Sequence, residues 1–255
     1  MPDILNNTMQ QLTTASNYGF SIVSLDELGA AEYTLATIAV DLSGSVSGWE
    51  RELEKCVKTI VKSCQDSPRS DNLLLRVITF DNNLREIHGF RLLSDIDVSE
   101  YDNAFQVGGS TALFDAVQSA IEASDAYAEI LVDQEYDVNA VVYVLSDGCD
   151  NASGATINTV KDAMITAKTR EKLQSIAAIL IGVGYDSGGY VAQALDDFKN
   201  GSDITQFVDL TELFNKQSPA KALAKLAGYV SRSISTTSQA LSSGTSTAAS
   251  SQLTF

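Results

Sequence analysis

The sequence predicts an α/β protein with a doubly wound, mostly parallel sheet of six strands and helices on both faces. Short apolar runs, typical of buried strands, alternate along the chain with longer segments whose apolar residues recur at helical spacing. Small residues with side-chain oxygens also stand where three of these segments begin or end. In open α/β sheets, ligands bind at loop positions of this kind.

The expected strands follow in chain order. Residues 35–40 form an apolar run that predicts the first strand. Residues 73–80 predict the second, and the turn Asp81-Asn82-Asn83 returns the chain through 84–90 as a short antiparallel edge strand. The remaining strands are expected at 139–146, 175–182 and 206–210.

Helical spacing predicts the segments between the strands. A first helix is expected over residues 49–64, and others near 113–121, 160–167 and 189–198. The last helix is expected from Ser218 to Ile234, since Ser218 can cap it, Pro219 suits its first turn, and Leu223, Leu226 and Val230 continue a buried stripe.

The two ends of the chain differ from this pattern. Residues 1–32 are treated as an N-terminal extension, whose mixed patch at 18–23 either adds an edge strand or docks on the domain. Residues 33–236 are expected to form the domain. From Ser231 onward, 14 of 25 residues are Ser or Thr, so residues 237–255 are expected to form a flexible tail that lacks apolar area to offset the entropy of ordering.

Composition excludes some classes of function. The chain has 33 acidic and 17 basic residues, a net charge of −16 without a basic stripe, so nucleic acid is not an expected partner. The longest apolar run, 176–183, is too short to span a bilayer, and the start of the chain lacks the pattern of a secretion signal. We expect a cytoplasmic protein that does not enter membranes.

The cysteines fit a reducing compartment. Cys56 and Cys64 lie on one expected helix, with Cα atoms about 12 Å apart, too far for a disulfide. Cys149 follows Asp147-Gly148, where either an ordinary reduced thiol or a reactive one is conceivable. The ordinary thiol is favoured because the sequence places no second Cys or His nearby.

A D-x-S-x-S run at residues 41–45 directly follows the first strand. It places Asp41, Ser43 and Ser45 where their oxygens can converge on a divalent cation, although such a run is also typical of a turn that caps a helix. Two other motifs favour the metal site. Residues 108–111, Gly-Gly-Ser-Thr, open a helix, and residues 146–148, Ser-Asp-Gly, end another strand.

With these three motifs in this order, the chain from 33 to 235 resembles the von Willebrand factor type A family, which has a Rossmann-like fold and a metal-ion-dependent adhesion site. The resemblance implies that Ser43 and Ser45 are direct hydroxyl ligands and that Thr111 is a direct or water-bridged one. It implies that Asp41 and Asp147 act largely through water. It also implies a protein partner whose Asp or Glu completes the coordination of the metal.

Hydroxyl and carboxylate oxygens suit Mg²⁺, and Mn²⁺ and Ca²⁺ are alternatives. The rim around the ion is expected to contact the partner, with Trp49 as an anchor if it is exposed. The rim residues are Leu42, Gly44, Val46, Trp49, Gly109, Gly148 and Asp150. Val46 stands where many family members carry Met, a change expected to alter packing and not coordination.

Catalysis is not expected. The single histidine, His88, falls in the edge hairpin, so no Ser-His-Asp arrangement with the metal-loop serines is indicated. The sequence contains no phosphate-binding G-x-x-x-x-G-K-[ST] loop, and residues 182–185 lack the third glycine of a dinucleotide fingerprint. A metal on Asp41 and Asp147 that activates water for phosphoester hydrolysis is the remaining enzyme hypothesis. It lacks an evident base or cationic clamp.

Within the family, residues 146–151 and the Ser-rich end look most like soluble microbial members associated with tellurite resistance and stress response. This likeness suggests a kinase, phosphatase or ATPase as partner. An assembly protein that self-associates through its edges or ends is the alternative. Asp115 is interpreted as a first-turn helix carboxylate, and Asp150 and Asn151 as residues that cap or turn the chain into the next helix.

Overall fold

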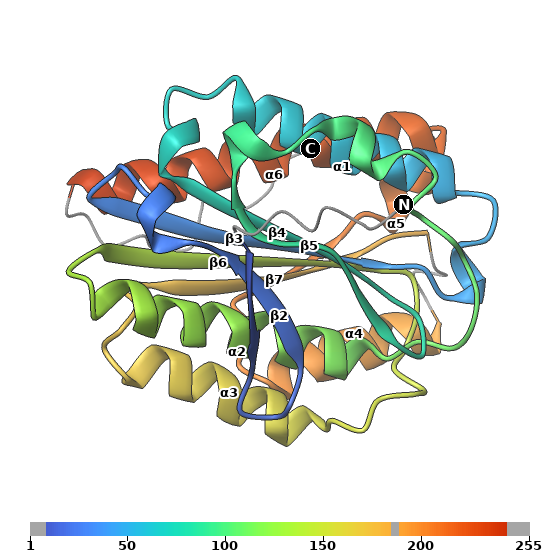
Figure 1. Cartoon of the computed structure of the whole chain (residues 1–255). Helices are drawn as coiled ribbons and strands as arrows, with labels where there is room; N and C mark the ends of the chain where they lie inside the picture. Colours follow the sequence, from blue (N-terminus) through green and yellow to red (C-terminus); the bar gives the residue numbers. More distant parts are fainter. Residues whose placement is uncertain (1–8, 185–188, 244–255) are drawn as a thin grey trace, which may run out of the picture.

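The computed structural model describes residues 9–184 and 189–243. Eight strands form one sheet in the order β1-β2-β5-β4-β3-β6-β7-β8, and helices cover both of its faces (Figure 1). The strands are β1 (Met9–Thr13), β2 (Gly19–Val23), β3 (Glu32–Asp41), β4 (Leu73–Phe80), β5 (Leu84–Leu92), β6 (Asp137–Ser146), β7 (Ile176–Gly182) and β8 (Gln206–Asp209). The α/β class and the mostly parallel sheet are confirmed, whereas the expected number of six strands is wrong.

Two strands near the N-terminus account for the difference. β2 pairs in parallel with β5 at Ile22 and Phe90, and β1 pairs antiparallel with β2 at the edge of the sheet. Phe20 and Ile22 are each 1% exposed, so β2 adds apolar area to the core. Of the two alternatives for the patch at 18–23, the structure shows an added strand, although the edge position is taken by β1. β5 is antiparallel to β4 as expected, but it is an inner strand and not an edge strand.

β3 occupies the centre of the sheet. It pairs in parallel with β4 on one side and with β6 on the other. From Tyr33 to Asp41 every residue of β3 is buried, as expected for a parallel strand covered on both faces. The pairing of Val40 with Leu145 brings the carboxyl ends of β3 and β6 side by side. The loops that follow these two strands therefore meet at one edge of the sheet.

The helices form two layers. α1 (Glu50–Gln65) and α6 (Pro219–Ser243) cover one face, and α2 (Leu113–Val132), α3 (Ile157–Thr169) and α4 (Tyr190–Gly201) cover the other (Figure 1). The short α5 (Thr211–Lys216) precedes α6. Cys56 and Cys64 are buried free thiols on α1, as expected. Within the described part of the chain, none of the helices combines the length and apolar character needed to cross a membrane.

α6 extends further than the composition predicts. The sequence predicts a flexible tail from residue 237, whereas the helix continues to Ser243. Ser231 and Thr237 each donate a hydroxyl hydrogen bond to the carbonyl oxygen four residues earlier, at 2.8 and 2.9 Å. Ser238 is fully buried, and its carbonyl oxygen accepts a hydrogen bond from Arg69 at 3.2 Å. Polar contacts thus hold the last turns of α6, and residues 244–255 lie outside the described residues.

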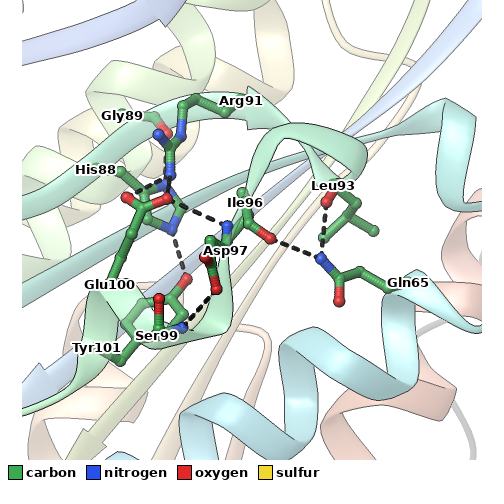
Figure 2. A network of polar contacts seen from close by, with 10 residues as sticks. All are labelled: Gln65, His88, Gly89, Arg91, Leu93, Ile96, Asp97, Ser99, Glu100 and Tyr101. Atoms are coloured by element: carbon green, nitrogen blue, oxygen red, sulfur yellow. Dashed lines mark hydrogen bonds and ion pairs between the residues drawn. The ribbon is translucent and has the colours of Figure 1, made fainter.

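A polar network joins β5 to the segment that follows it (Figure 2). His88 Nδ1 donates to the carbonyl oxygen of Gly89 at 2.9 Å, and Nε2 accepts from the Tyr101 hydroxyl at 2.6 Å. Arg91 forms an ion pair with Glu100 in the same network at 2.7 Å. Burial lowers the pKa of His88 to about 4, so the ring is neutral at pH 7. These contacts give the single histidine a structural role.

Candidate metal centre

Asp41, the last residue of β3, is held by two hydrogen bonds at the edge of the sheet. Its Oδ1 accepts from the backbone N–H of Ser43 at 2.8 Å, and its Oδ2 accepts from the Ser146 hydroxyl at 2.6 Å. The side chain is 1% exposed. Because β3 and β6 are neighbours, the serine that ends β6 reaches the aspartate that ends β3. The carboxylate is therefore fixed before any ligand arrives.

The turn after β3 brings the two serines of the motif together. Residues Gly44–Val46 form a single 3₁₀ turn. Within it the hydroxyls of Ser43 and Ser45 are 3.0 Å apart. Ser45 Oγ also donates to Asp147 Oδ1 at 2.7 Å. The hydroxyls of the first motif thus contact the carboxylate of the third.

The loop before α2 supplies Thr111. Its backbone N–H donates to Asn151 Oδ1 at 2.8 Å, which links this loop to the one after β6. A methyl group placed on Gly148 would lie 3.7 Å from Thr111 Oγ1 and 3.9 Å from Ser45 Oγ. The Thr111 and Ser45 hydroxyls therefore both lie within 4 Å of one point beside Gly148. All five residues expected to bind the metal meet at this edge.

Two backbone hydrogen bonds join the loop after β3 to the loop before α2. Gly108 N donates to the carbonyl oxygen of Leu42 at 2.9 Å, and Gly44 N donates to that of Gly109 at 3.1 Å. Gly109 has φ of +74°, and a side chain there would meet Asn82 Oδ1 at 2.2 Å. Glycine is required at this position because other residues rarely adopt such a φ and no space remains. The backbone of these loops therefore helps to hold the candidate ligands in place.

The expected rim is only partly exposed. Leu42 and Val46 are each 1% exposed and pack in the core with α1 and α6, so the expectation that they contact a partner is wrong. Leu42, Ser43 and Val46 are buried in this turn, and Gly44 and Ser45 are the residues that face solvent. Gly109 is exposed as well, and Gly148 is partly exposed. The open surface of the site is therefore made of small residues.

Trp49 and Asp150 have structural contacts in the fold. Trp49 is partly buried, and its ring occupies the space where a side chain on Gly184 would lie. Asp150 Oδ1 accepts from the backbone N–H of Phe114 at 3.1 Å, so it caps α2. The helix that Asp150 caps is thus the preceding α2, and Asp150 also accepts from the Ser153 hydroxyl in the loop that leads to α3. α2 needs this remote cap because Ala112 cannot supply one.

Asp115 does more than favour the start of α2. It accepts hydrogen bonds from the backbone N–H groups of Gly154 and Ala155 at 3.1 and 2.8 Å. The Tyr18 hydroxyl donates to the same carboxylate at 2.8 Å. Asp115 thus connects α2, the loop after β6 and the N-terminal hairpin.

Several supporting residues were not predicted from the sequence. Ser146 and Asn151 hold Asp41 and Thr111, respectively, and Asp81 accepts at its carbonyl oxygen from the N–H of Ala112 at 2.7 Å. Ser146 lies within the third motif and Asn151 three residues after it, but the strand pattern and the turn preference of Asn hid their roles. Asp81 gave no signal because its contact is through the backbone.

The site contains two neighbouring carboxylates, Asp41 and Asp147. Burial raises the pKa of Asp41, and the hydrogen bonds from Ser146 and Ser43 oppose this shift. Burial and, to a smaller degree, the negative charge of Asp41 raise the pKa of Asp147 to about 6. No lysine, arginine or histidine among residues 9–184 and 189–243 donates to either carboxylate. A cation bound between them would offset this unfavourable arrangement.

The donor set fits a small hard cation. It consists of two carboxylates and three hydroxyls, all oxygen, as Mg²⁺ prefers. In an octahedron with a metal–oxygen distance of ~2.1 Å, adjacent oxygens lie ~3.0 Å apart. The oxygens of Ser43 and Ser45 are 3.0 Å apart, and those of Ser45 and Asp147 are 2.7 Å apart. In the described ranges no cluster of three or more His, Cys, Asp or Glu side chains offers another site.

No protein-family model and no curated protein sequence matches this chain. Its fold is similar to solved structures. A mutant form of the PilB minor pilin from Streptococcus sanguinis has a TM-score of 0.58 at 13% identity, covering 88% of this chain and 66% of that one. The pilus adhesin SpaC from Lactobacillus rhamnosus GG, in an open conformation, has a TM-score of 0.57 at 11% identity, covering 82% and 31%.

Proximal thread matrix protein 1 from the mussel byssus has a TM-score of 0.50 at 17% identity, covering 83% of this chain and 47% of that one. Another structure of the mussel protein, with a zinc-occupied MIDAS motif, gives 0.46, which is too low to support an inference. This chain spans at most about two thirds of the length of these proteins. At such low identity the similarity shows the α/β fold alone.

Proposed function

We propose that this chain is a von Willebrand factor type A module that binds a divalent cation, Mg²⁺ by preference, and through it a protein partner. The observation that carries the proposal is the convergence of five oxygen-bearing side chains from three separate loops. They are Asp41, Ser43, Ser45, Thr111 and Asp147. The order of the three motifs along the sequence supports the family assignment.

Each residue has a distinct role in this proposal. Ser43 and Ser45 supply neutral hydroxyl oxygens, so they bind the ion without adding charge. Asp41 would stay fixed by its two hydrogen bonds, and Asp147 would exchange its contact with Ser45 for one with water on the ion. Thr111 would add a third hydroxyl, directly or through water. The ion, when bound, supplies a hard Lewis acid that attracts a further carboxylate. Because only two local carboxylates surround it, a third from outside is not strongly repelled.

The partner is proposed to reach the ion from the solvent side. Gly44, Ser45 and Gly109 are exposed there. Small residues leave room for an Asp or Glu side chain on a protruding loop. A kinase, phosphatase or ATPase of the same cell is the partner class that the likeness to microbial stress proteins suggests, and we propose a cytoplasmic setting on the same basis.

Metal binding is tested first, with Mn²⁺ as the probe. Electron paramagnetic resonance counts free Mn²⁺ during titration of the full chain. We expect one bound ion, displaced by Mg²⁺, in the native chain and in the Ser47→Ala variant. Ser47 is the matched control, because it is an exposed serine in the same turn and outside the ligand set. Ser43→Ala and Ser45→Ala should each weaken Mn²⁺ binding at least tenfold. Equal Mn²⁺ binding by all three variants would refute the proposal.

Capture of a carboxylate is tested separately. In the Mn²⁺-loaded protein, ¹³C-labelled acetate that reaches the ion shows strong line broadening. We expect this broadening in the native chain and in Ser47→Ala, and its loss in Ser43→Ala. Metal binding without broadening would retain the metal site and refute carboxylate capture. Affinity purification from a cell lysate in Mg²⁺ and in chelator then identifies the partner.

Self-association is a second candidate function. Among the described residues, β1 is an edge strand that pairs with β2 alone, so its outer side has no partner strand there. Light scattering after size-exclusion chromatography separates the two candidates. A monomer with and without Mg²⁺ supports the binding module, whereas a metal-independent oligomer supports assembly. Hydrolysis is less favoured, because no basic side chain in the described ranges contacts the two carboxylates to serve as a clamp.

A further inference from the structure

A cavity lies on the α2 side of the sheet, near the turn between β4 and β5. Its volume is about 320 Å³, at the lower end of the range of small-molecule sites. β2 and β5 are paired at one residue only, so the sheet leaves room beside the beginning of β2. Gly19 of β2, Leu84 of β5 and Ser119 of α2 line different walls. The five metal-site residues are not among its lining residues.

The floor of this cavity contains two polar groups without partners. Arg76, in the middle of β4, is 1% exposed. Its Nε donates to Glu86 at 2.8 Å, but its Nη1 has no hydrogen-bond partner. Ser119 is fully buried, and its hydroxyl is also unpartnered. Both residues line the cavity. Of the nine buried side-chain polar atoms without a hydrogen-bond partner in the described residues, two belong to residues that line this one cavity, and a partner at the cavity would satisfy both.

The acidic residues of the cavity are already satisfied. Glu86 accepts from Arg76 and from the backbone N–H and hydroxyl of Ser21. Asp115 accepts from the Tyr18 hydroxyl and from two backbone N–H groups. The lining therefore holds one guanidinium and two carboxylates. An anionic ligand would be repelled by the carboxylates, and a cationic one by Arg76.

The mouth of the cavity is neutral and polar. Asn17, Asn82 and Asn83 line it, and all three are exposed. Their amides both donate and accept hydrogen bonds, and the half-buried ring of Tyr18 adds an apolar surface beside them. A ligand that matches this lining carries no net charge and has several groups that both donate and accept. Hydroxyl groups on a compact carbon frame have these properties.

We propose that this cavity binds a neutral polyhydroxyl compound of the size of a monosaccharide. A ligand oxygen accepts from Arg76 Nη1, a neighbouring hydroxyl pairs with Ser119, and the asparagine amides bind the outer hydroxyls. The small cavity volume limits the ligand to one sugar ring or a similar polyol. None of the five candidate metal ligands takes part in this site.

Saturation-transfer NMR on the full chain tests the proposal. The probes are glucose, galactose, mannose, N-acetylglucosamine and myo-inositol, each at about 10 mM, which suffices to detect a millimolar Kd. Acetate and inorganic phosphate are the anionic comparisons, and chelator is present throughout. Asn83→Trp is designed to block the mouth, and Ser119→Leu to fill the floor. Asn200→Trp is the matched control, an exposed asparagine on α4 that does not line the cavity.

We expect transfer to at least one of the five polyols in the native chain and in Asn200→Trp, at least a fivefold loss in Asn83→Trp, and none to the anions. Asn83 is exposed, so this variant tests the site even if Ser119→Leu fails to fold. Three results overturn the proposal: no transfer to any polyol, equal transfer in the two tryptophan variants, or stronger binding of acetate or phosphate. If the cavity holds only ordered water, no transfer to any polyol will be seen.

Discussion

Removal of the Ser146 hydroxyl should destabilise the protein through Asp41. The Ser146→Ala change deletes the hydrogen bond to Asp41 Oδ2, which is 2.6 Å long. Ser146 is fully buried and Asp41 is 1% exposed, so water cannot easily replace the lost donor. The variant leaves one oxygen of a buried carboxylate unsatisfied.

The expected cost follows from this geometry. A hydrogen bond to a charged group contributes about 1.5–3 kcal/mol, and the deep burial of both residues places this one in the upper half of the range. With a urea m-value of about 3 kcal/mol/M for a chain of this size, a loss of ~2–3 kcal/mol lowers the unfolding midpoint by ~0.7–1 M.

Ser124→Ala is the matched control. Ser124 is fully buried too, but its hydroxyl donates at 2.9 Å to the carbonyl oxygen of Ala120, a neutral helix acceptor. Its loss should change the free energy of unfolding by less than ~0.5 kcal/mol. Urea unfolding followed by circular dichroism, in chelator at pH 7, compares the two variants. Equal midpoints would refute the inferred role of Ser146. A double-mutant cycle with Asp41→Asn should give a coupling energy above ~1 kcal/mol.

Three further predictions concern the loops, pH and metal. Gly109→Ala should destabilise the chain by at least ~1 kcal/mol in urea unfolding because of its positive φ and lack of space, whereas Gly108→Ala should not. The pKa of His88 is about 4 in the native chain and 6.5 in the unfolded chain, so its contribution to stability is complete above pH 6.5 and is lost as the pH falls. Between pH 7.5 and 5 the free energy of unfolding should fall by about 2 kcal/mol for this reason. The His88→Gln variant should lack this pH-dependent component. Mg²⁺ at 100 times its Kd should stabilise the native chain by about 2.7 kcal/mol in thermal unfolding. The same Mg²⁺ concentration should stabilise the Ser47→Ala variant equally and the Ser43→Ala variant much less. A pH-independent difference between native and His88→Gln, or equal Mg²⁺ stabilisation of both serine variants, would contradict these expectations.

The central strands were predictable because their physics is local. Residues 35–40 and 139–146 are nearly continuous apolar runs, which parallel strands covered on both faces require. Asp41 and Asp147 follow such runs, so topology alone brings them to one edge. The five candidate ligands were therefore accessible from sequence, and the structure brings them together.

The missed features depend on contacts between distant segments. β1 and β2 have five residues each and little periodic pattern, and β2 is fixed by burial against the sheet. Leu42 and Val46 fall in a loop motif, and only the packing of α1 and α6 shows that they belong to the core. Asp150 caps a helix that precedes it by 36 residues, a pairing that local capping rules do not contain.

The last turns of α6 set the point at which this chain can be shortened. Composition suggests a cut near residue 237, but Thr237 accepts at its carbonyl oxygen from Asn139 of β6 at 2.9 Å, and Ser238 contacts Arg69. Arg69 in turn forms an ion pair with Glu32 at the start of β3. The low-complexity end of the helix therefore fastens the amino ends of the two central strands, on the side of the sheet opposite the metal centre. A protein engineer who trims it as a disordered tail would loosen the strands that place Asp41 and Asp147.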